Sequence, residues 1–255
     1  MHAAERETLI LDAVCRTGFV SYRDLEAQLD ASPATIRRDL SRMEGRAQLV
    51  RVHGGARAVR RDGPPRLVGT PFDQAITQNL AAKQAIGRAA AALCKPGEGV
   101  MIDGGTTTLQ MCPHLAGLAL QVLTNSLHIV EALLPQPDTR ILLPSGSLFR
   151  EQNIILAPAG EDSMPRFHAP KLFMGAAAVG LQGAMQADVV LVAAERRLID
   201  RAEEVILLVD SSKFAKRSGA IVCGLDEIDV LVTDDAIARD MAQAIEDAGV
   251  RLIVA

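Results

Sequence analysis

The chain has 255 residues, of which 49% are hydrophobic and 23% charged, a composition that excludes a disordered or fibrous protein. No apolar stretch reaches the roughly 18 residues that a bilayer-spanning helix needs, and the amino terminus lacks the apolar segment of a secretory signal, so we expect a cytoplasmic protein without a membrane partner. The formal net charge of −4 is the sum of two unlike parts of the chain.

Basic residues concentrate toward the amino terminus. Residues 1–62 contain 11 arginines and 9 acidic residues, a charge of +2, whereas the other 193 residues carry −6. Residues 31–61 alone hold eight arginines against two acidic residues, a charge of +6. Such a basic stripe on an otherwise acidic chain is typical of a protein that binds a phosphate backbone, although charge alone also fits a solvated arginine-rich face.

The cysteines are far apart in the sequence and form no C-x-x-C pair. A cysteine and a histidine come close together in Cys112-Pro113-His114, where a metal ion would need two further donors that no pattern supplies. We therefore expect free, buried thiols and no metal site. The four cysteines are Cys15, Cys94, Cys112 and Cys223.

Two short helices are predicted in the first 30 residues. Residues 5–15 place apolar side chains on one helical face, and Gly18 follows where a helix commonly stops. Ser21 then begins a second helix with Asp24 three residues on, which is the spacing of a capping box. The side chains of the second helix that face inward are Tyr22, Leu25 and Leu29.

A third helix is predicted after Ser32, a favourable N-cap, with Pro33 at the first position, where its missing N–H is not needed. Its apolar stripe is Ile36, Leu40 and Met43. The opposite face exposes Ala34, Thr35, Arg37, Arg38, Ser41 and Arg42. Two short helices joined by a three-residue turn make a helix-turn-helix, whose second helix reads base edges in the major groove, with arginine as the commonest bidentate partner of guanine.

A β-hairpin is predicted after the third helix. Residues 49–52 and 56–59 flank His53-Gly54-Gly55, and glycines between two such runs favour a tight turn. Arg51, His53 and Arg57 of this wing can contact phosphates, although a structural role in the turn fits His53 equally well and the whole unit also fits a protein docking module. We predict DNA contacts from Ser32, Ala34, Thr35, Arg37, Arg38, Arg42, Arg51 and His53.

These motifs resemble those of a known family. The run Ser-Pro-Ala-Thr-Ile-Arg-Arg-Asp-Leu at residues 32–40, followed by Arg-Val-His-Gly-Gly-Ala at residues 51–56, is similar to the signature of the DeoR family of bacterial sugar-catabolism repressors. The similarity extends over nearly the whole chain, with Asp30 and Ala47 standing where the family usually has glycine. The resemblance implies a winged helix-turn-helix regulator with a carboxy-terminal effector domain.

Residues 60–71 contain three prolines and two glycines without periodicity, which predicts a linker between domains at residues 1–59 and 72–255. Beyond it, apolar runs alternate with alanine-rich helical patterns, so we predict an α/β domain with a mostly parallel sheet and helices on both faces. The predicted strands are residues 100–102, 120–123, 141–143, 172–174, 205–209, 230–232 and 252–254. The helical patterns include residues 80–93, 126–134, 191–202 and 235–248.

Small polar residues follow five of these strands. Ligands of open α/β sheets bind beyond the carboxyl ends of the strands, and glycine N–H groups, hydroxyls and the positive end of a helix beginning near Thr107 all suit an anion. Each loop alone is more typical of a helix cap or a turn, so the prediction rests on the recurrence of such loops at several strand ends. We predict effector contacts from Asp103, Gly104, Gly105, Thr106, Thr107, Thr108, Thr124, Asn125, Ser126, Ser145, Gly146, Gly175 and Lys213.

Lys213 is the one lysine at such a strand end, so we expect it to be the charge partner of a phosphate. A phosphate would repel Asp103, which is therefore expected to bind sugar hydroxyls, to orient its loop, to contact Lys213 or to cap the following helix. The motifs G-x-G-x-x-G and G-x-x-x-x-G-K-[ST] are absent from the sequence, which counts against a dinucleotide or nucleoside-triphosphate site, and no cofactor is expected.

The family resemblance implies the same class of ligand. In the DeoR family, the segments that match residues 103–108, 124–126 and 211–214 line a pocket for phosphorylated sugars or related metabolites. The effector domain of the family is similar to ribose-5-phosphate isomerase. This chain has Pro170 where aspartate is common and Ser145 where glycine is usual, two departures that bear on which ligand is bound.

The sequence therefore predicts a DNA-binding transcriptional regulator, a repressor of a sugar or sugar-alcohol catabolic operon that responds to a phosphorylated sugar. Because winged modules bind paired half-sites, we expect a homodimer or homotetramer. The alternative is a sugar-phosphate isomerase-like enzyme fused to a DNA-binding module, which would need a general base such as Asp103, Glu195 or Asp210. No paired acid and base is distinguishable by spacing, and Glu195, next to Arg196 and Arg197, is interpreted as a surface charge, so no catalytic residue is predicted.

Overall fold

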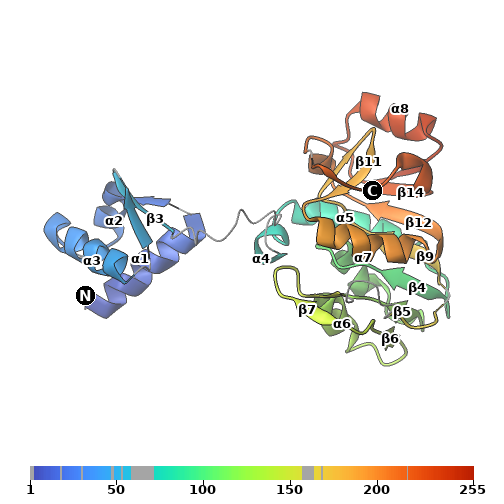
Figure 1. Cartoon of the computed structure of the whole chain (residues 1–255), viewed down its shortest axis with the longest axis horizontal. Coiled ribbons are helices and arrows are strands. Elements are labelled where there is room, and N and C mark those ends of the chain that lie inside the picture. Colours follow the sequence, from blue (N-terminus) through green and yellow to red (C-terminus); the bar gives the residue numbers. More distant parts are fainter. Residues whose placement is uncertain are drawn as a thin grey trace. The chain divides into compact units, whose positions relative to one another are not determined.

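The chain divides into two compact units, Met1–Arg66 and Leu67–Ala255 (Figure 1). The predicted linker at residues 60–71 lies outside the described residues, so the predicted domain boundaries stay predictions. Asp30, Ala47 and His53 also lie outside the described residues. The computed structural model describes residues 3–17, 19–29, 31–46, 49–52, 54–58, 72–156, 164–167, 169–216 and 218–255.

The amino-terminal unit is a winged helix-turn-helix, as predicted. Its helices are α1 (Ala3–Thr17), α2 (Tyr22–Gln28) and α3 (Pro33–Gly45). The strands β1 (Phe19–Ser21), β2 (Leu49–Val52) and β3 (Gly55–Ala58) form an antiparallel sheet in the order β1-β3-β2, in which β2 and β3 are the predicted wing. Between them, Gly54 has a φ of +89°, a conformation that favours glycine.

Local capping explains where the two helices of the helix-turn-helix begin. The Ser21 hydroxyl accepts a hydrogen bond from the backbone N–H of Asp24, and the Asp24 carboxylate accepts one from Ser21, which confirms the predicted capping box. Ser32 accepts from the backbone N–H of Thr35 at 3.3 Å, and Pro33 opens α3. The core beneath these helices includes the buried side chains of Ile10, Leu25, Ile36, Leu40 and Met43.

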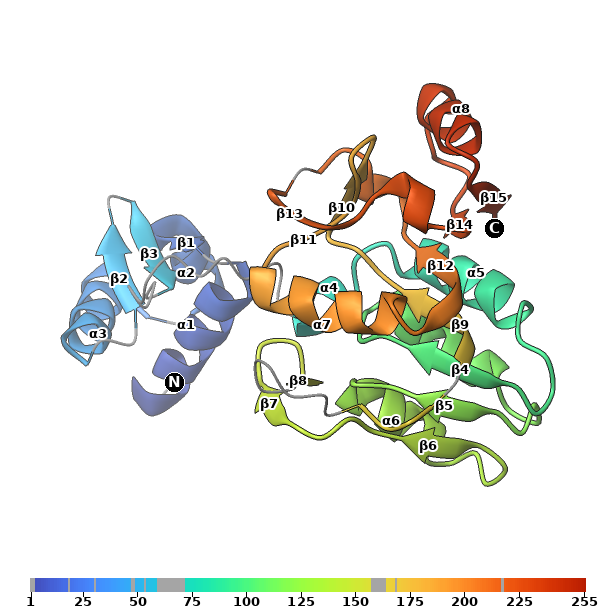
Figure 2. The same cartoon turned by 45° about the vertical axis from the view of Figure 1, so that its right-hand side comes forward.

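The larger unit is built on a seven-stranded parallel sheet, which confirms the predicted fold class (Figure 2). Every predicted strand is present, and the strand order is β15-β14-β12-β9-β4-β5-β6, with parallel pairing throughout. The strands are β4 (Gly99–Ile102), β5 (Gln121–Leu123), β6 (Arg140–Leu142), β9 (Ala169–Met174), β12 (Ala202–Leu208), β14 (Val230–Thr233) and β15 (Arg251–Val254).

Helices cover both faces of this sheet. They are α5 (Leu80–Ala91), α6 (Leu127–Leu133), α7 (Val189–Ile199), α8 (Arg239–Asp247) and the 3-10 helix η1 (Thr108–His114). In β4, Val100 and Ile102 pack into a core with α5, α6 and η1, whereas Met101 packs into the opposite core with α7 and α8. Strands that are buried on both faces read as continuous apolar runs, which is why the sequence predicted them.

Several smaller elements were not predicted. They are three or four residues long, too short for a periodic pattern to mark them. Two antiparallel groups are among them: the hairpin of β7 (Ser147–Phe149) and β8 (Ile154–Leu156), and the sheet of β10 (Ala178–Gly180), β11 (Gly183–Gln186) and β13 (Ala220–Cys223). The others are the short helices α4 (Phe72–Ala75), η2 (Ser211–Lys213) and η3 (Leu225–Glu227).

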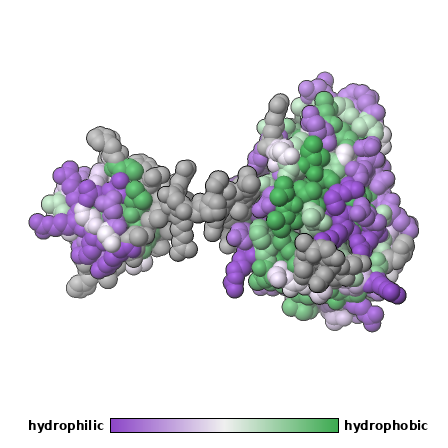
Figure 3. Space-filling model, in the orientation of Figure 1, coloured by the Kyte–Doolittle hydropathy of each residue, from purple (hydrophilic) through white to green (hydrophobic). Residues whose placement is uncertain are grey.

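Hydrophobic residues also gather on one exposed face of the larger unit (Figure 3). The large hydrophobic side chains that are exposed on α7 and around the β10–β11–β13 sheet are Leu181, Val189, Val190 and Ile221. Contiguous apolar surface of this kind commonly marks a contact with another protein molecule.

Gly87 lies where α5 packs against η1, and a Cβ atom built there would come within 2.5 Å of the backbone carbonyl carbon of Gln110. We expect Gly87→Ala to lower the free energy of unfolding by about 1–3 kcal/mol, because the helix must move to admit the methyl group. Urea denaturation of the full chain measures this change. The matched control is Gly219→Ala, where no atom lies within 4 Å of the added Cβ and the free energy of unfolding should change by less than about 0.5 kcal/mol. Equal stability of the two variants would contradict the prediction.

Candidate functional site

The outer face of α3 is the candidate DNA interface. Neither Arg37 nor Arg38 has a salt bridge or hydrogen bond within the described residues, so both keep their N–H donors for another molecule. The guanidinium carbon of Arg37 lies 5.8 Å from the centre of the Tyr22 ring, a cation–π contact that holds this side chain beside α2. Thr35 is half-buried, and the other exposed predicted residues here are Ser32, Ala34 and Arg42.

Arg42 and Arg46, in contrast, are paired with acidic residues of their own unit. Arg42 donates to Glu7 Oε1 at 2.6 Å and to Asp39 Oδ1 at 2.6 Å, and Arg46 Nη1 lies 3.1 Å from Glu7 Oε2. Asp39 is buried and also accepts from Arg6 Nε at 2.8 Å. The hydrogen bond with Glu7 is the main reason why the pKa of Arg42 is raised. These pairs tie α3 to α1 and offset part of the positive charge that the sequence predicted for DNA.

In the wing, Arg51 is also held internally. Its guanidinium donates to the Ser41 hydroxyl, its Nε lies 3.8 Å from Glu44 Oε2, and its backbone N–H donates to Glu44 Oε1 at 3.0 Å. Of the other wing residues predicted to contact DNA phosphates, His53 and the side chain of Arg57 lie outside the described part of the chain. Among the predicted arginines, Arg37 and Arg38 are therefore the two without an ionic partner in the described part of the chain.

At the carboxyl end of the parallel sheet, two of the predicted effector loops are joined by hydrogen bonds. The backbone N–H of Gly104 donates to Asn125 Oδ1 at 3.0 Å, and Asn125 Nδ2 donates to Asp103 Oδ1 at 2.9 Å. In the second loop, the hydroxyl of Thr124 accepts from the backbone N–H of Ser126 at 3.1 Å, and the Ser126 hydroxyl caps α6. The sheet therefore places the loops after β4 and β5 side by side, as expected.

The loop after β4 is tightly packed where it leads into η1. Thr108 donates its hydroxyl to two carbonyl oxygens of its own loop, at 2.8 and 3.0 Å. A Cβ on Gly104 would lie 2.5 Å from Ile154 Cγ2, so this position has no room for a side chain. Thr107 is buried and precedes η1, which is a 3-10 helix without a side-chain N-cap. The residues of this loop that are half-buried are Gly104, Gly105 and Thr106.

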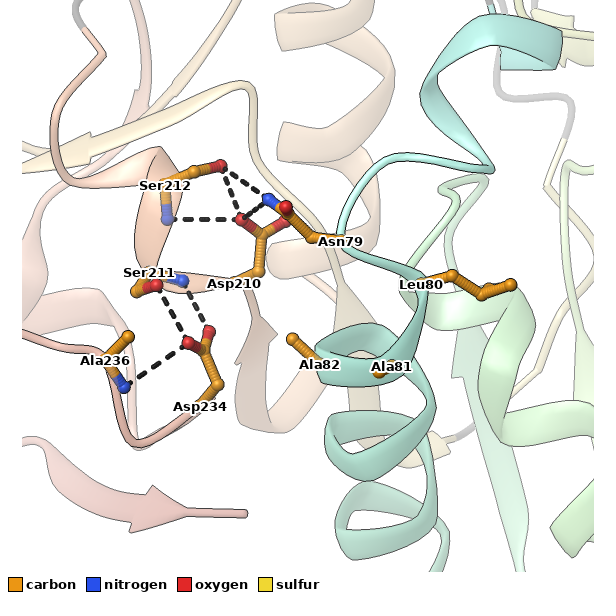
Figure 4. A pocket seen from close by; sticks show the side chains of 9 residues that line it. All are labelled: Asn79, Leu80, Ala81, Ala82, Asp210, Ser211, Ser212, Asp234 and Ala236. Atoms are coloured by element: carbon orange, nitrogen blue, oxygen red, sulfur yellow. Dashed lines mark hydrogen bonds between the residues drawn. The ribbon is translucent and has the colours of Figure 1, made fainter.

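A pocket of about 460 Å³ lies at the same edge of the sheet, between the start of α5 and the ends of β12 and β14 (Figure 4). Asp210 accepts from Asn79 Nδ2 at 2.9 Å and from the backbone N–H of Ser212 at 3.1 Å. Asp234 accepts from the backbone N–H and the hydroxyl of Ser211 at 2.6 and 2.8 Å. The pocket is lined by Asn79, Leu80, Ala81, Ala82, Asp210, Ser211, Ser212, Asp234 and Ala236.

Sequence reasoning found only one side of this pocket. The polar loop at residues 210–213 was identified, but Asn79 and Asp234 were not, although Asn79 directly precedes a helix and Asp234 directly follows a buried strand. None of the predicted effector residues lines the pocket, and Lys213 is the nearest in sequence to its lining residues.

Two lysines lie near this pocket. Lys213 is partly buried and, in the described part of the chain, has no hydrogen bond or salt bridge; burial lowers its pKa, as does the neighbouring Lys216, against the opposing effect of Asp210. Lys83 is buried, donates to the backbone oxygen of Ala75 at 2.6 Å and also has its pKa lowered by burial. Sequence reasoning missed Lys83 because a lysine in an alanine-rich helix usually faces water.

The interpretation of Glu195 as a surface charge is wrong. Glu195 is only 4% exposed, and its Oε1 accepts a hydrogen bond from Gln186 Nε2 at 2.6 Å. Leu191, Glu195 and Leu198 are spaced four and three residues apart on the buried face of α7, so helical periodicity contained this signal. The neighbouring arginines and the exposed valines at the start of α7 masked it.

Asp103 is fully engaged in orienting its own loop. Within the described residues it contacts Asn125, the Gly104 backbone and Glu195, while η1 is preceded by Thr107 rather than capped by Asp103. Burial raises the pKa of Asp103 to about 6, against the opposing effect of these hydrogen bonds. Of the roles considered for Asp103, these contacts support loop orientation.

The remaining predicted effector residues stand apart from the hydrogen bonds described above. Ser145 and Gly146 are exposed between β6 and β7, and Gly175 follows β9, where a Cβ would lie 3.9 Å from the carbonyl oxygen of Leu208 at the end of β12. Over the described residues, no group of three His, Cys, Asp or Glu side chains could hold a metal ion, and no helix combines the length and apolarity that crossing a membrane requires. The free, buried thiols in this part of the chain are Cys94, Cys112 and Cys223.

Comparison with known proteins finds a matching family model for each of the two units. A model of the DeoR-like helix-turn-helix domain matches residues 6–62, and a model of the DeoR C terminal sensor domain matches residues 78–235. The HTH-type transcriptional regulator UlaR of Shigella sonnei is 30% identical over 254 residues, which cover 99% of each chain. UlaR of Escherichia coli K12 matches with the same identity and coverage.

Two solved structures show more distant similarity. Ribose 5-phosphate isomerase A from Methanocaldococcus jannaschii matches with a TM-score of 0.40 and 16% identity over 53% of this chain and 55% of the isomerase. The probable sor operon regulator from Shigella flexneri matches with a TM-score of 0.38 and 11% identity over 71% of this chain and 92% of that regulator. The assignment rests on the two family models and the full-length relatives. The chain is therefore a DNA-binding transcriptional regulator that belongs to the DeoR family.

Proposed function

We propose that this regulator represses a sugar or sugar-alcohol catabolic operon, and that a phosphorylated sugar bound at the carboxyl end of the sheet lowers its affinity for the operator. The observation that carries the proposal is Lys213, a partly buried cation that has no hydrogen bond or salt bridge in the described part of the chain and follows the serines of the pocket. A partly desolvated cation that makes no hydrogen bond or salt bridge within the described residues favours an anionic ligand, and a phosphate supplies both charge and acceptor oxygens.

The surroundings suit the two ends of such a ligand. The phosphate would lie near Lys213 and the start of α5, where Asn79 makes no side-chain cap and the first backbone N–H groups of the helix remain available to an anion. The sugar hydroxyls would meet those polar groups of the loops after β4 and β5 that are not already hydrogen-bonded within the loops. We propose that the site senses this ligand without converting it.

We further infer that the regulator is a homodimer or homotetramer. Paired reading heads match paired half-sites on DNA, and most soluble oligomers are symmetric assemblies of one chain. The exposed hydrophobic residues around α7 and the β10–β11–β13 sheet are available for a contact between copies (Figure 3).

A thermal-shift screen of ribose 5-phosphate and other phosphorylated sugars and sugar alcohols tests the effector site. A ligand at 100 times its Kd should stabilise the folded chain by about 2.7 kcal/mol and should be recovered unchanged. The unphosphorylated form of the same sugar is the control and should give no shift. Conversion of the ligand into an isomer, lost in Asp103→Asn, would instead favour the isomerase alternative, and the absence of a shift across the screen would contradict the effector proposal.

A further inference from the structure

A line of buried polar side chains crosses the edge of the sheet behind the effector loops. Gln186 of β11 donates to Glu195 Oε1 at 2.6 Å, and the carboxyl group of Glu195 faces that of Asp103 after β4. Asp103 accepts from Asn125 Nδ2 at 2.9 Å, and Asn125 in turn accepts from the backbone N–H of Gly104 at 3.0 Å. The line therefore connects α7 and the β10–β11–β13 sheet to the loop that shapes the effector edge.

One carboxyl oxygen in this line of side chains has no hydrogen-bond donor within the described residues. Glu195 Oε2 is buried and has no hydrogen-bond partner within the described residues, and the carboxyl group of Asp103 lies close enough to interact with that of Glu195. Two ionised carboxylates in this position would repel each other in a site that water cannot screen. A proton on one of them removes the repulsion and supplies the missing hydrogen bond.

Glu195 is the acid that keeps the proton. Burial, together with the nearby Asp103, raises the pKa of Glu195 well above its ordinary value, whereas Asn125 and the Gly104 backbone donate to Asp103 and favour its ionised form. A protonated Glu195 therefore accepts from Gln186 with one oxygen and donates to Asp103 with the other.

We propose that Glu195 is a positioning residue of the effector loop, because the hydrogen bond from its protonated carboxyl group to the Asp103 carboxylate holds Asp103, Asn125 and Gly104 in place. The consequence for effector binding rests on the proposed function, but the shared proton and the position of the loop do not.

The other groups around Glu195 leave this assignment intact. In the described part of the chain, Asp103 and Gln186 are the groups that act on its carboxyl group. From β13, the Cys223 thiol lies close enough to interact, but burial raises the pKa of this thiol to about 11, so it stays neutral. Arg196, the next residue of α7, is engaged by an acidic side chain of η3 at 2.6 Å.

Glu195→Gln tests the shared proton because it reproduces the protonated acid with an amide that does not titrate. The pKa of Glu195 is raised on folding, so the folded chain binds one more proton than the unfolded chain between the ordinary pKa and the raised one. Wild-type stability should therefore fall as pH rises through this window, by about tenfold in the folding equilibrium constant per pH unit relative to Glu195→Gln. Urea denaturation of the full chain at several pH values measures both slopes.

Asp200→Asn is the matched control, since it neutralises an exposed carboxylate at the end of the same helix and should keep the wild-type slope. Identical pH slopes for wild type and Glu195→Gln would overturn the shared proton. No ligand enters this measurement, so its failure is distinct from failure of the effector proposal.

Hydrogen exchange at the Gly104 amide tests the positioning role. Glu195→Ala should speed exchange of this amide at least about tenfold, because Asp103 and Asn125 lose their support, whereas Glu195→Gln should keep wild-type protection. Wild-type protection in Glu195→Ala, or equal loss of protection in the alanine and glutamine variants, would overturn the proposal. Should Glu195→Ala fail to fold, the exchange rate of the Gly104 amide in Glu195→Gln and the pH dependence of the stability of this variant still test the proposal.

Discussion

Replacing Arg37 and Arg38 by alanine is expected to weaken operator binding by about 1–3 kcal/mol for each residue, with little change in the free energy of unfolding. Both arginines are exposed on α3 and have no ionic partner within the described residues, so their removal costs the folded unit few contacts. Fluorescence anisotropy with a duplex selected from a random library by the full chain measures the loss. Urea denaturation of the same variants measures stability.

Two lysine variants separate recognition of the bases from attraction by positive charge. Arg37→Lys and Arg38→Lys keep the charge but lose the planar guanidinium group that pairs with guanine. They should therefore bind random duplexes like wild type while losing affinity for the selected duplex. Arg42→Ala should instead lower stability, because Arg42 bonds both Glu7 and Asp39. Wild-type affinity of the alanine variants for the selected duplex would contradict the interface proposed on α3.

Lys213→Ala is expected to shift the response to the phosphorylated sugar to much higher ligand concentrations while leaving operator binding without ligand unchanged. A charge-assisted hydrogen bond contributes about 1.5–3 kcal/mol, so ligand affinity should fall by roughly ten- to more than a hundredfold. Lys213 has no salt bridge in the described part of the chain, and its removal should therefore leave the fold intact. Thermal shift against ligand concentration measures the affinity.

Lys216→Ala is the matched control for Lys213. Lys216 is an exposed lysine near Lys213, so its removal should change the local charge without removing a ligand contact. Equal losses of affinity in the two variants would show that general charge, rather than a contact from Lys213, attracts the ligand.

The sheet of the larger unit was predictable because helices cover both of its faces. Parallel strands covered on both faces need apolar side chains, and β4 and residues 205–208 of β12 read as such runs. The hairpin of β7 and β8 was not predictable, since its strands have three residues each and Ser147 and Leu148 are exposed. In the amino-terminal unit, the caps of Ser21 and Ser32 are local interactions, so the sequence contained them fully.

The candidate sites were predictable only in part, because ionic partners come from tertiary structure. The sequence identified the arginines of α3 but not that Glu7, 35 residues before Arg42, offsets one of them. It identified the loops at the strand ends because small polar residues recur after several of the apolar runs. It could not show that Glu195 faces Asp103, because the contact depends on how α7 packs against the end of β4.

The most direct test of the account is the effect of a metabolite on operator binding by the full chain. Anisotropy of the selected duplex would be followed while the phosphorylated sugar with the largest thermal shift is added, at fixed salt concentration because phosphate contacts make affinity salt-dependent. We expect the operator Kd to rise at least about tenfold, which corresponds to a coupling free energy within the usual range of about 1–3 kcal/mol, and Lys213→Ala to shift this effect to much higher ligand concentrations. An operator Kd that no phosphorylated sugar changes, although one of them binds, would contradict the claim that this protein connects a sugar-phosphate sensor to DNA.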